Sequence, residues 1–262
     1  MKKWAEIFSL ILFPLTAVVL IALQIKTLGF ILLLVGILSL LFCSLTFRRD
    51  IILLYLCLLL LGLTPINTST EFPHALYMGI TLFLVVFGPY IICKKVYKNN
   101  LVKFPFHHGR SWKRSEILYI VITAFIGYLI LPVMLRSTGS YHNWNIQPGL
   151  YNLTKSYIGL NAVGIWDELF FVSTVLAILR KHLPFIWANL TQAVIFTSFL
   201  YTLAFQGWCF IVIYIFALTQ GYIFKKTESL LYVITIHLTF DLILHLTIVY
   251  LHYPSWFPFF IT

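Results

Sequence analysis

The sequence has little charge. Asp, Glu, Lys and Arg make up only 10% of its 262 residues, whereas a soluble globular domain carries about 25%. Hydrophobic residues make up 61%, and long apolar runs separate the clusters of charge. An α-helix needs a run of roughly 17–25 apolar residues to cross a bilayer. The composition therefore excludes an ordinary soluble domain and indicates a protein with many membrane-spanning helices.

Cysteines are also few, and they form neither a Cys-x-x-Cys motif nor another metal-ligand spacing. Each lies within or at the edge of an apolar run, which predicts buried thiols rather than a disulfide framework. These residues are Cys43, Cys57, Cys93 and Cys209. The first apolar run lacks a small-x-small cleavage site and is therefore expected to be a first span rather than a cleavable signal.

The net charge of +10 is of the kind that nucleic-acid-binding proteins carry. Here, however, the basic residues lie in short connectors between apolar runs, so we expect no nucleic-acid partner. Of the 18 Lys and Arg residues, alternate connectors hold all but three, which are Lys26, Arg136 and Lys155. Because cytoplasmic connectors are enriched in Lys and Arg, this asymmetry predicts a cytoplasmic N-terminus and a C-terminus outside.

The expected fold class is all-α, a polytopic membrane helix bundle with about nine transmembrane helices. The expected spans are residues 7–24, 28–47, 51–66, 74–93, 116–135, 157–179, 184–205, 208–224 and 229–251. We divide the chain into an N-terminal five-span region without an assigned role, 1–135, an outside loop, 136–156, and a core, 157–262. We expect an integral protein of the cytoplasmic membrane of a bacterium, in contact with membrane lipid.

Acidic residues are scarcer still, since the chain has eight. Asp167, Glu168 and Asp241 fall within expected spans, where an ionised side chain costs at least about 2.5 kcal/mol. Such intramembrane acids usually mark a functional site. The other five lie at span ends or in connectors, where acids need no special explanation: Glu6, Asp50, Glu71, Glu116 and Glu228.

The intramembrane acids are expected to meet histidines near the middle of the bilayer. Measured along each helix from the basic end of its span, Asp167 lies about 20 Å in and His237 about 16 Å in. In the last span, residues spaced by four share one helical face. These are His237, Asp241 and His245. A polar pair that only holds two membrane helices together is the structural alternative.

Three segments carry the candidate residues, and their order and spacing resemble the motifs of a known family. They are Asp167-Glu168-Leu169-Phe170-Phe171-Val172, Phe196-Thr197-Ser198-Phe199-Leu200 and His237-Leu238-Thr239-Phe240-Asp241. The segment from Ile165 to His245 resembles the CPBP family, also called Abi or CAAX protease-like intramembrane peptidases. The motifs of that family are E-E-x-x-x-R, F-x-x-x-H and H-x-x-x-N (or D).

The resemblance implies a membrane-embedded hydrolase that cleaves a peptide bond in a hydrophobic or lipidated peptide. It implies that Asp167 or Glu168 is the general base and that His237 binds the oxyanion, the water or a metal. Asp241 would orient His237 or hydrogen-bond the intermediate. A divalent metal such as zinc is compatible with this set, although nothing in the spacing demands it. Residues expected to support the site or contact substrate are Phe196, Leu200 and His245.

Two positions depart from the family pattern, because Val172 stands in place of the arginine and Leu200 in place of the second-motif histidine. Leucine can neither donate a hydrogen bond nor bind a metal. Two functions therefore stay open, and we favour the first. One is a glutamate- or metal-dependent intramembrane endopeptidase with a degenerate site. The other is a catalytically inactive protein of the same fold that binds a peptide, a lipid or a partner, for example in bacteriocin immunity or export.

A proton-coupled transporter is a third alternative, because buried acids and histidines also form proton relays. No span broken by Gly or Pro lies near the acids, and such a break is typical of transporter sites.

Overall fold

The computed structural model describes residues 2–106, 111–256 and 260, and the regular secondary structure of this part of the chain is all helical, with no strand. The all-α prediction is therefore confirmed. The helices are α1 (Lys2–Ala17), α2 (Lys26–Ser39), α3 (Leu45–Leu63), α4 (His74–Ile91), α5 (Arg114–Thr138), α6 (Leu150–Asp167), α7 (Leu176–Arg180), α8 (Phe185–Leu203), α9 (Cys209–Thr227) and α10 (Leu230–His252). Wider π-helical turns continue α1 over Val18–Ala22 and α4 over Ile92–Val96, and another joins α6 to α7 over Glu168–Val175.

Among the described residues, 7 helices are long and apolar enough to cross a membrane. They are Lys2–Ala22, His74–Val96, Arg114–Thr138, Leu150–Arg180, Phe185–Leu203, Cys209–Thr227 and Leu230–His252. The second and third expected spans also form helices. However, α2 and its final turn end at Phe42, and α3 carries Arg48, Arg49 and Asp50 near its start. The architecture is thus a polytopic helical bundle, and each expected span corresponds to a helix.

The outer face of the bundle is apolar. Leu76 and Phe83 on α4, and Val121 and Phe125 on α5, are among the large hydrophobic side chains that the fold leaves exposed. Extended surfaces of this kind make soluble proteins associate, whereas they match the hydrocarbon interior of a bilayer. Together with the spanning helices, this surface identifies an integral membrane protein.

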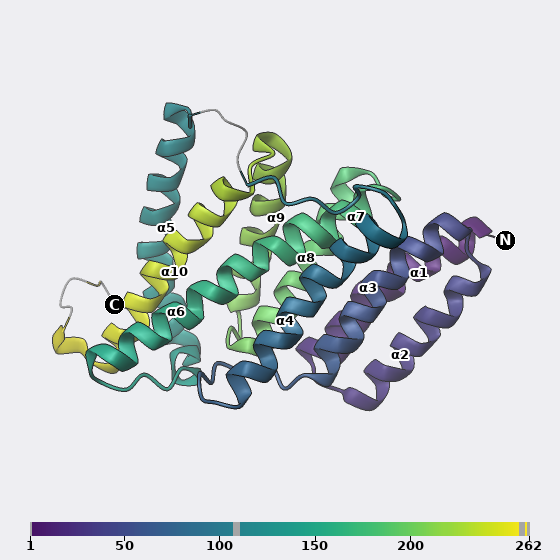
Figure 1. The fold of residues 1–262 in the computed structure, drawn as a ribbon. Helices are drawn as coiled ribbons and strands as arrows, with labels where there is room; N and C mark the ends of the chain where they lie inside the picture. Colours follow the sequence, from purple (N-terminus) through teal and green to yellow (C-terminus); the bar gives the residue numbers. More distant parts are fainter. Residues whose placement is uncertain (1, 107–110, 257–259, 261–262) are drawn as a thin grey trace.

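The helices that carry the three motifs are α6 with its π-helical continuation, α8 and α10. Helix α10 packs against α5 and α6, and α8 packs against α9 and the end of α1. Figure 1 shows α1, α2 and α3 together at one side of the molecule and α5 with α10 at the other, with α4, α6 and α8 between them.

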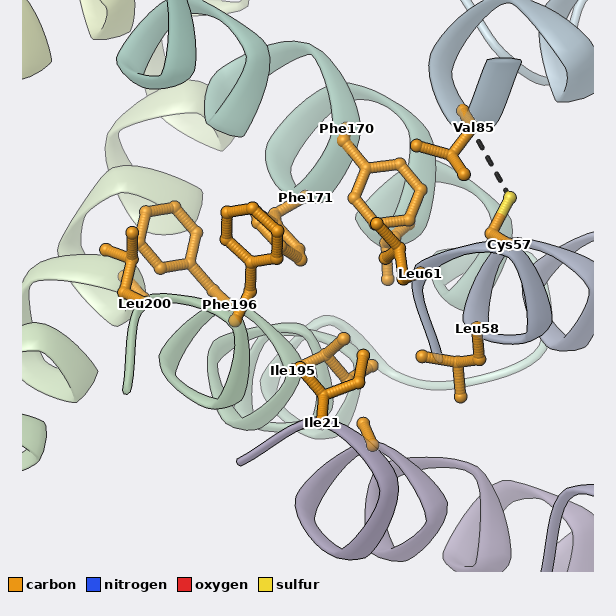
Figure 2. Close-up of a cluster of buried hydrophobic side chains, with 14 of the residues drawn as sticks. Ile21, Cys57, Leu58, Leu61, Val85, Phe170, Phe171, Ile195, Phe196 and Leu200 are labelled. Carbon is orange, nitrogen blue, oxygen red and sulfur yellow. Dashed lines mark hydrogen bonds between the residues drawn. The ribbon is translucent and has the colours of Figure 1, made fainter. Parts of the chain in front are cut away.

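An apolar core joins the N-terminal helices to the motif helices (Figure 2). Ile21, after α1, and Leu58, on α3, belong to the same cluster of buried side chains as Phe171 of the central π-helical turn and Phe196 of α8. The rings of Phe171 and Phe196 are 4.8 Å apart between centroids. Cys57 donates from its Sγ to a backbone carbonyl of α4 across 3.5 Å. The four cysteines are all free and buried, which confirms the prediction for the thiols.

The helix bounds differ from the expected loop 136–156, because α5 continues to Thr138 and α6 begins at Leu150. The first two turns of α6 contain Tyr, Asn, Thr, Lys and Ser, so the sequence shows no apolar run there. Glycines with positive φ stand at both ends of the shorter connector, Gly139 at 68° and Gly149 at 104°. This backbone region is readily open to glycine, which is why it ends helices so often.

Asp50, which the sequence places at a span end without a special role, is fully buried. Its Oδ2 lies 2.6 Å from Nζ of Lys181 and 2.8 Å from Nε2 of His182, both in the turn after α7. Burial alone would raise the pKa of Asp50, but the hydrogen bonds from His182 and Lys181 hold it below its ordinary value. The carboxylate therefore ties α3 to the helix that carries the first motif.

Replacing Asp50 with Asn is expected to destabilise the protein by about 1.5–3 kcal/mol at neutral pH, the contribution of hydrogen bonds to a charged group. A carboxyl group with a lowered folded pKa stabilises the protein above its unfolded pKa of about 4. That contribution is lost as the pH falls through the folded value. The difference in melting temperature between wild type and D50N should thus shrink below about pH 4, measured by tryptophan fluorescence in detergent.

The matched control is Glu71→Gln, which removes the exposed pair formed by Glu71 and Lys155 and should change the melting temperature little. Equal melting temperatures for D50N and wild type at neutral pH would contradict the proposed role of Asp50.

Candidate active site

Asp167 and Glu168 lie where the helix changes its winding. Regular α-helix ends at Asp167, and the π-helical turn runs over Glu168–Val175. A π-helical turn admits an extra residue per turn and often occurs at functional sites. Both side chains are buried, with 1% of Asp167 and none of Glu168 exposed.

His237 of α10 joins the first motif to the third. Its Nδ1 lies 2.7 Å from Oε1 of Glu168, and because a carboxylate accepts, Nδ1 donates this hydrogen bond. Its Nε2 points to the other side, 3.8 Å from Oδ2 of Asp167 and 3.8 Å from Oδ1 of Asp241. The structure therefore brings together all four residues expected to be catalytic.

A residue that the sequence analysis missed, Gln220 of α9, completes this arrangement. Its Nε2 donates to Oε1 of Glu168 across 2.8 Å and to the backbone carbonyl of Val233 across 3.0 Å. The side chain is fully buried. The sequence does contain a signal for Gln220, which is an amide side chain inside a largely apolar span. Such amides often form contacts between membrane helices.

A small cavity of about 50 Å³ borders the group. Asp167, His237 and Asp241 line it, whereas Glu168 does not. Both carboxylate oxygens of Asp167 and Oδ2 of Asp241 lack a hydrogen-bond partner among the described residues. A water molecule needs roughly 10–15 Å³ and two to four polar partners. The cavity thus has room for water beside two acids and an imidazole nitrogen.

The remaining wall of the cavity is mostly apolar. Leu200 lines it, so the leucine stands where a histidine of the second motif would face the same space. Phe196 is buried beside His237, with ring centroids 6.1 Å apart. Val172 is fully buried but does not line the cavity.

His245 lies apart from this group. Its Nε2 is 2.9 Å from Oγ of Ser156 near the start of α6, and it does not line the cavity. It shares a helical face with Asp241, as its spacing predicted, but its contact is with α6 rather than with the acids.

Within the described part of the chain, no group of three or more His, Cys, Asp or Glu side chains is placed to hold a metal ion. Nε2 of His237 lies 3.8 Å from the nearest carboxylate oxygens. The carboxylates of Asp167 and Asp241 and the imidazole of His237 are groups that can take up and release protons.

Residues 150–243 match a family model described as type II CAAX prenyl endopeptidase Rce1-like. The match covers α6 to α9 and much of α10, and so includes the three motifs and Gln220. No curated protein and no solved structure gives a significant match to this chain.

Gly164, one turn before the acids, is expected to be essential for the arrangement. A Cβ at this position would lie 2.2 Å from Oδ2 of Asp241 and 3.1 Å from Cδ2 of His237. Gly164→Ala should therefore displace Asp241 and destabilise the protein by about 1–3 kcal/mol, as overpacking does. Thermal unfolding can be followed with a thiol-reactive fluorophore, because the native cysteines are buried.

Gly159→Ala in the same helix is the control, since its Cβ would meet only the methyl group of Thr70 at 3.2 Å. A G164A protein as stable as G159A would show that the close packing of α6 on α10 is not required.

Proposed function

Because residues 150–243 match the model of the Rce1-like type II CAAX prenyl endopeptidases, we propose that this protein is an intramembrane peptidase of the CPBP type that acts on hydrophobic or lipidated peptides. The observation that carries the proposal is the meeting of Asp167, His237 and Asp241 around one buried cavity. We place it in the cytoplasmic membrane of a bacterium, and the distribution of Lys and Arg supports a cytoplasmic N-terminus.

In the proposed mechanism, Asp167 is the general base. It lines the cavity, and its oxygens are free of other hydrogen bonds among the described residues. Asp167 takes a proton from a water molecule, and the water oxygen forms a bond to the carbonyl carbon of the peptide. The proton then passes to the leaving nitrogen as the carbon–nitrogen bond breaks.

His237 and Glu168 take different roles from Asp167. Glu168 accepts a hydrogen bond from Nδ1 of His237. This contact leaves Nε2 as the ring nitrogen that is turned to the cavity. Nε2 is left to contact the water or the oxyanion, and Asp241 orients the ring from its other side, 3.8 Å away. Gln220 is a positioning residue, because it donates a hydrogen bond to Glu168 and so helps to hold the carboxylate that orients His237.

The apolar side chain at position 200 favours a second candidate function. Leu200 lies on the wall of the cavity and supplies no polar atom there. A protein of this fold that lacks a polar group at this position could bind a hydrophobic peptide, a lipid or a partner protein without cleaving it. The two functions differ in turnover, which purified protein can test.

Asp167→Asn, Glu168→Gln and His237→Ala are each expected to lower turnover by about 100-fold or more, the contribution of a positioned acid–base group. The assay incubates purified protein with a set of lipidated and hydrophobic peptides and detects cleavage by mass spectrometry. Controls are Glu71→Gln and His252→Ala, because Glu71 is an exposed acid and His252 bonds to the backbone of its own helix. Controls and wild type should cleave equally.

Leu200→His is expected to raise turnover on the order of 100-fold, because it returns an acid–base group to the cavity wall. Leu203→His, on the same helix and also lining the cavity, is the control for added polarity and should not raise turnover. If neither wild type nor L200H cleaves any peptide of the set, the peptidase proposal is wrong and the binding function remains.

A further inference from the structure

A groove much larger than the catalytic cavity lies between α4 and α6. Its volume is about 530 Å³, within the range of pockets that hold small ligands. Within the groove, Trp166 donates from Nε1 to the backbone carbonyl of Leu82 on α4 across 2.7 Å. From there the two helices diverge toward their N-terminal ends (Figure 1).

The lining changes in chemistry along the groove. Toward the inner end it is apolar, formed by Met78, Leu82, Val86, Trp166 and Leu169. Toward the helix starts it is polar, with hydroxyl, amide and ammonium groups at Asn67, Thr68, Ser69, Thr70, Asn145, Lys155 and Ser156. A ligand that matches this gradient has a hydrocarbon chain and a polar head.

The groove opens sideways, to the region that the bilayer occupies. Phe83 on α4 and Ile158 on α6 both line it and are 57% and 62% exposed. Because both helices are long and apolar enough to span a membrane, hydrocarbon chains surround these rims. A gap of this size that faces lipid is accessible to lipid chains without any rearrangement of the helices.

Lys155 determines the charge at the polar end. Its Nζ pairs with Oε1 of Glu71 across 2.8 Å, but Glu71 is 79% exposed and the lysine itself keeps 31% of its side chain exposed. An exposed pair of this kind is weak, so a phosphate can replace or share the carboxylate. We propose that this groove binds one bilayer phospholipid, with an acyl chain between α4 and α6 and its phosphate at Lys155.

The bound chain would contact the wall of the catalytic cavity. Leu160, Val163 and Leu203 line both the groove and the cavity. The lipid therefore packs against the same side chains that enclose Asp167, His237 and Asp241. This inference does not depend on peptide cleavage, since an inactive protein of this fold would keep the groove.

Two glycines of α4 supply a matched test. A Cβ atom at Gly79 or at Gly88 would meet no atom within 4 Å, but only Gly79 lines the groove. Gly79→Leu should fill the groove without disturbing the helix and lower phospholipid affinity by about tenfold or more, as expected when several methylenes lose their contact. Gly88→Leu should bind as wild type does. Native mass spectrometry of delipidated full-length protein, titrated with dioleoylphosphatidylglycerol, measures both.

The phosphate contact has its own test. Lys155→Gln should lower affinity for dioleoylphosphatidylglycerol about fivefold, the contribution of one cation near a lipid surface, and should leave dioleoylglycerol, which has no phosphate, unaffected. Arg136→Gln is the control, because Arg136 is an exposed cation at the end of α5 that does not line the groove.

Several results would overturn the proposal. Phospholipid binding by G79L equal to that of G88L would show that lipid binds elsewhere. Loss of a dimer in G79L, with lipid binding unchanged, would assign the groove to a second copy of the chain. Slower peptide cleavage in G79L, with lipid binding unchanged, would assign it to the peptide. If the protein cleaves no peptide, the phospholipid affinities expected for wild type, G79L and G88L stay the same, so the two proposals can fail separately.

Discussion

The hydrogen bond between Glu168 and His237 is the contact on which the polar interior of this bundle depends. An isolated carboxylate inside a protein costs several kcal/mol, and Glu168 is fully buried in a helix that spans the membrane. Two donors, His237 and Gln220, converge on its Oε1 from α10 and α9. One carboxylate oxygen thus joins the helix of the first motif to α9 and α10, whose donors lie 52 and 69 residues further along the chain.

The change from α- to π-helical winding at Glu168 lets neighbouring acids take separate tasks. Asp167 reaches the cavity, whereas Glu168 faces the donors behind His237. The same turn directs Phe170 and Phe171 into the core, where Trp166 stacks on Phe170 with ring centroids 5.1 Å apart. Polar and apolar packing therefore fix the π-helical turn from opposite sides, and the chain keeps one continuous helix through the site.

Hydropathy predicted the helices well because the cost of burying polar groups in a bilayer is large for each residue. It predicted the spans and the four residues of the candidate site, and the spacing of His237, Asp241 and His245 correctly put them on one face. It did not reveal that α6 begins at Leu150, because the first turns of this helix are polar and helical hydrogen bonds do not require apolar side chains.

The roles of the residues could not be predicted from spacing alone. A regular helix does not show which of two adjacent acids faces a cavity, since this depends on the π-helical turn. Gln220 lies in a span without a motif, and Asp50 is buried only because Lys181 and His182 come from a distant turn. These contacts depend on tertiary packing, which the pattern of a single sequence does not encode. The direction of the chain across the membrane stays a prediction from its Lys and Arg residues.

The burial of the four thiols has a practical consequence for that direction. With Cys43, Cys57, Cys93 and Cys209 enclosed, the folded chain offers no native target to a membrane-impermeant maleimide. A single cysteine introduced into a connector, for example in place of Ser69 or Asn99, would then be the accessible label site on its side of the bilayer. The wild-type background is in this sense already suited to cysteine-accessibility mapping, without the removal of any residue from the core.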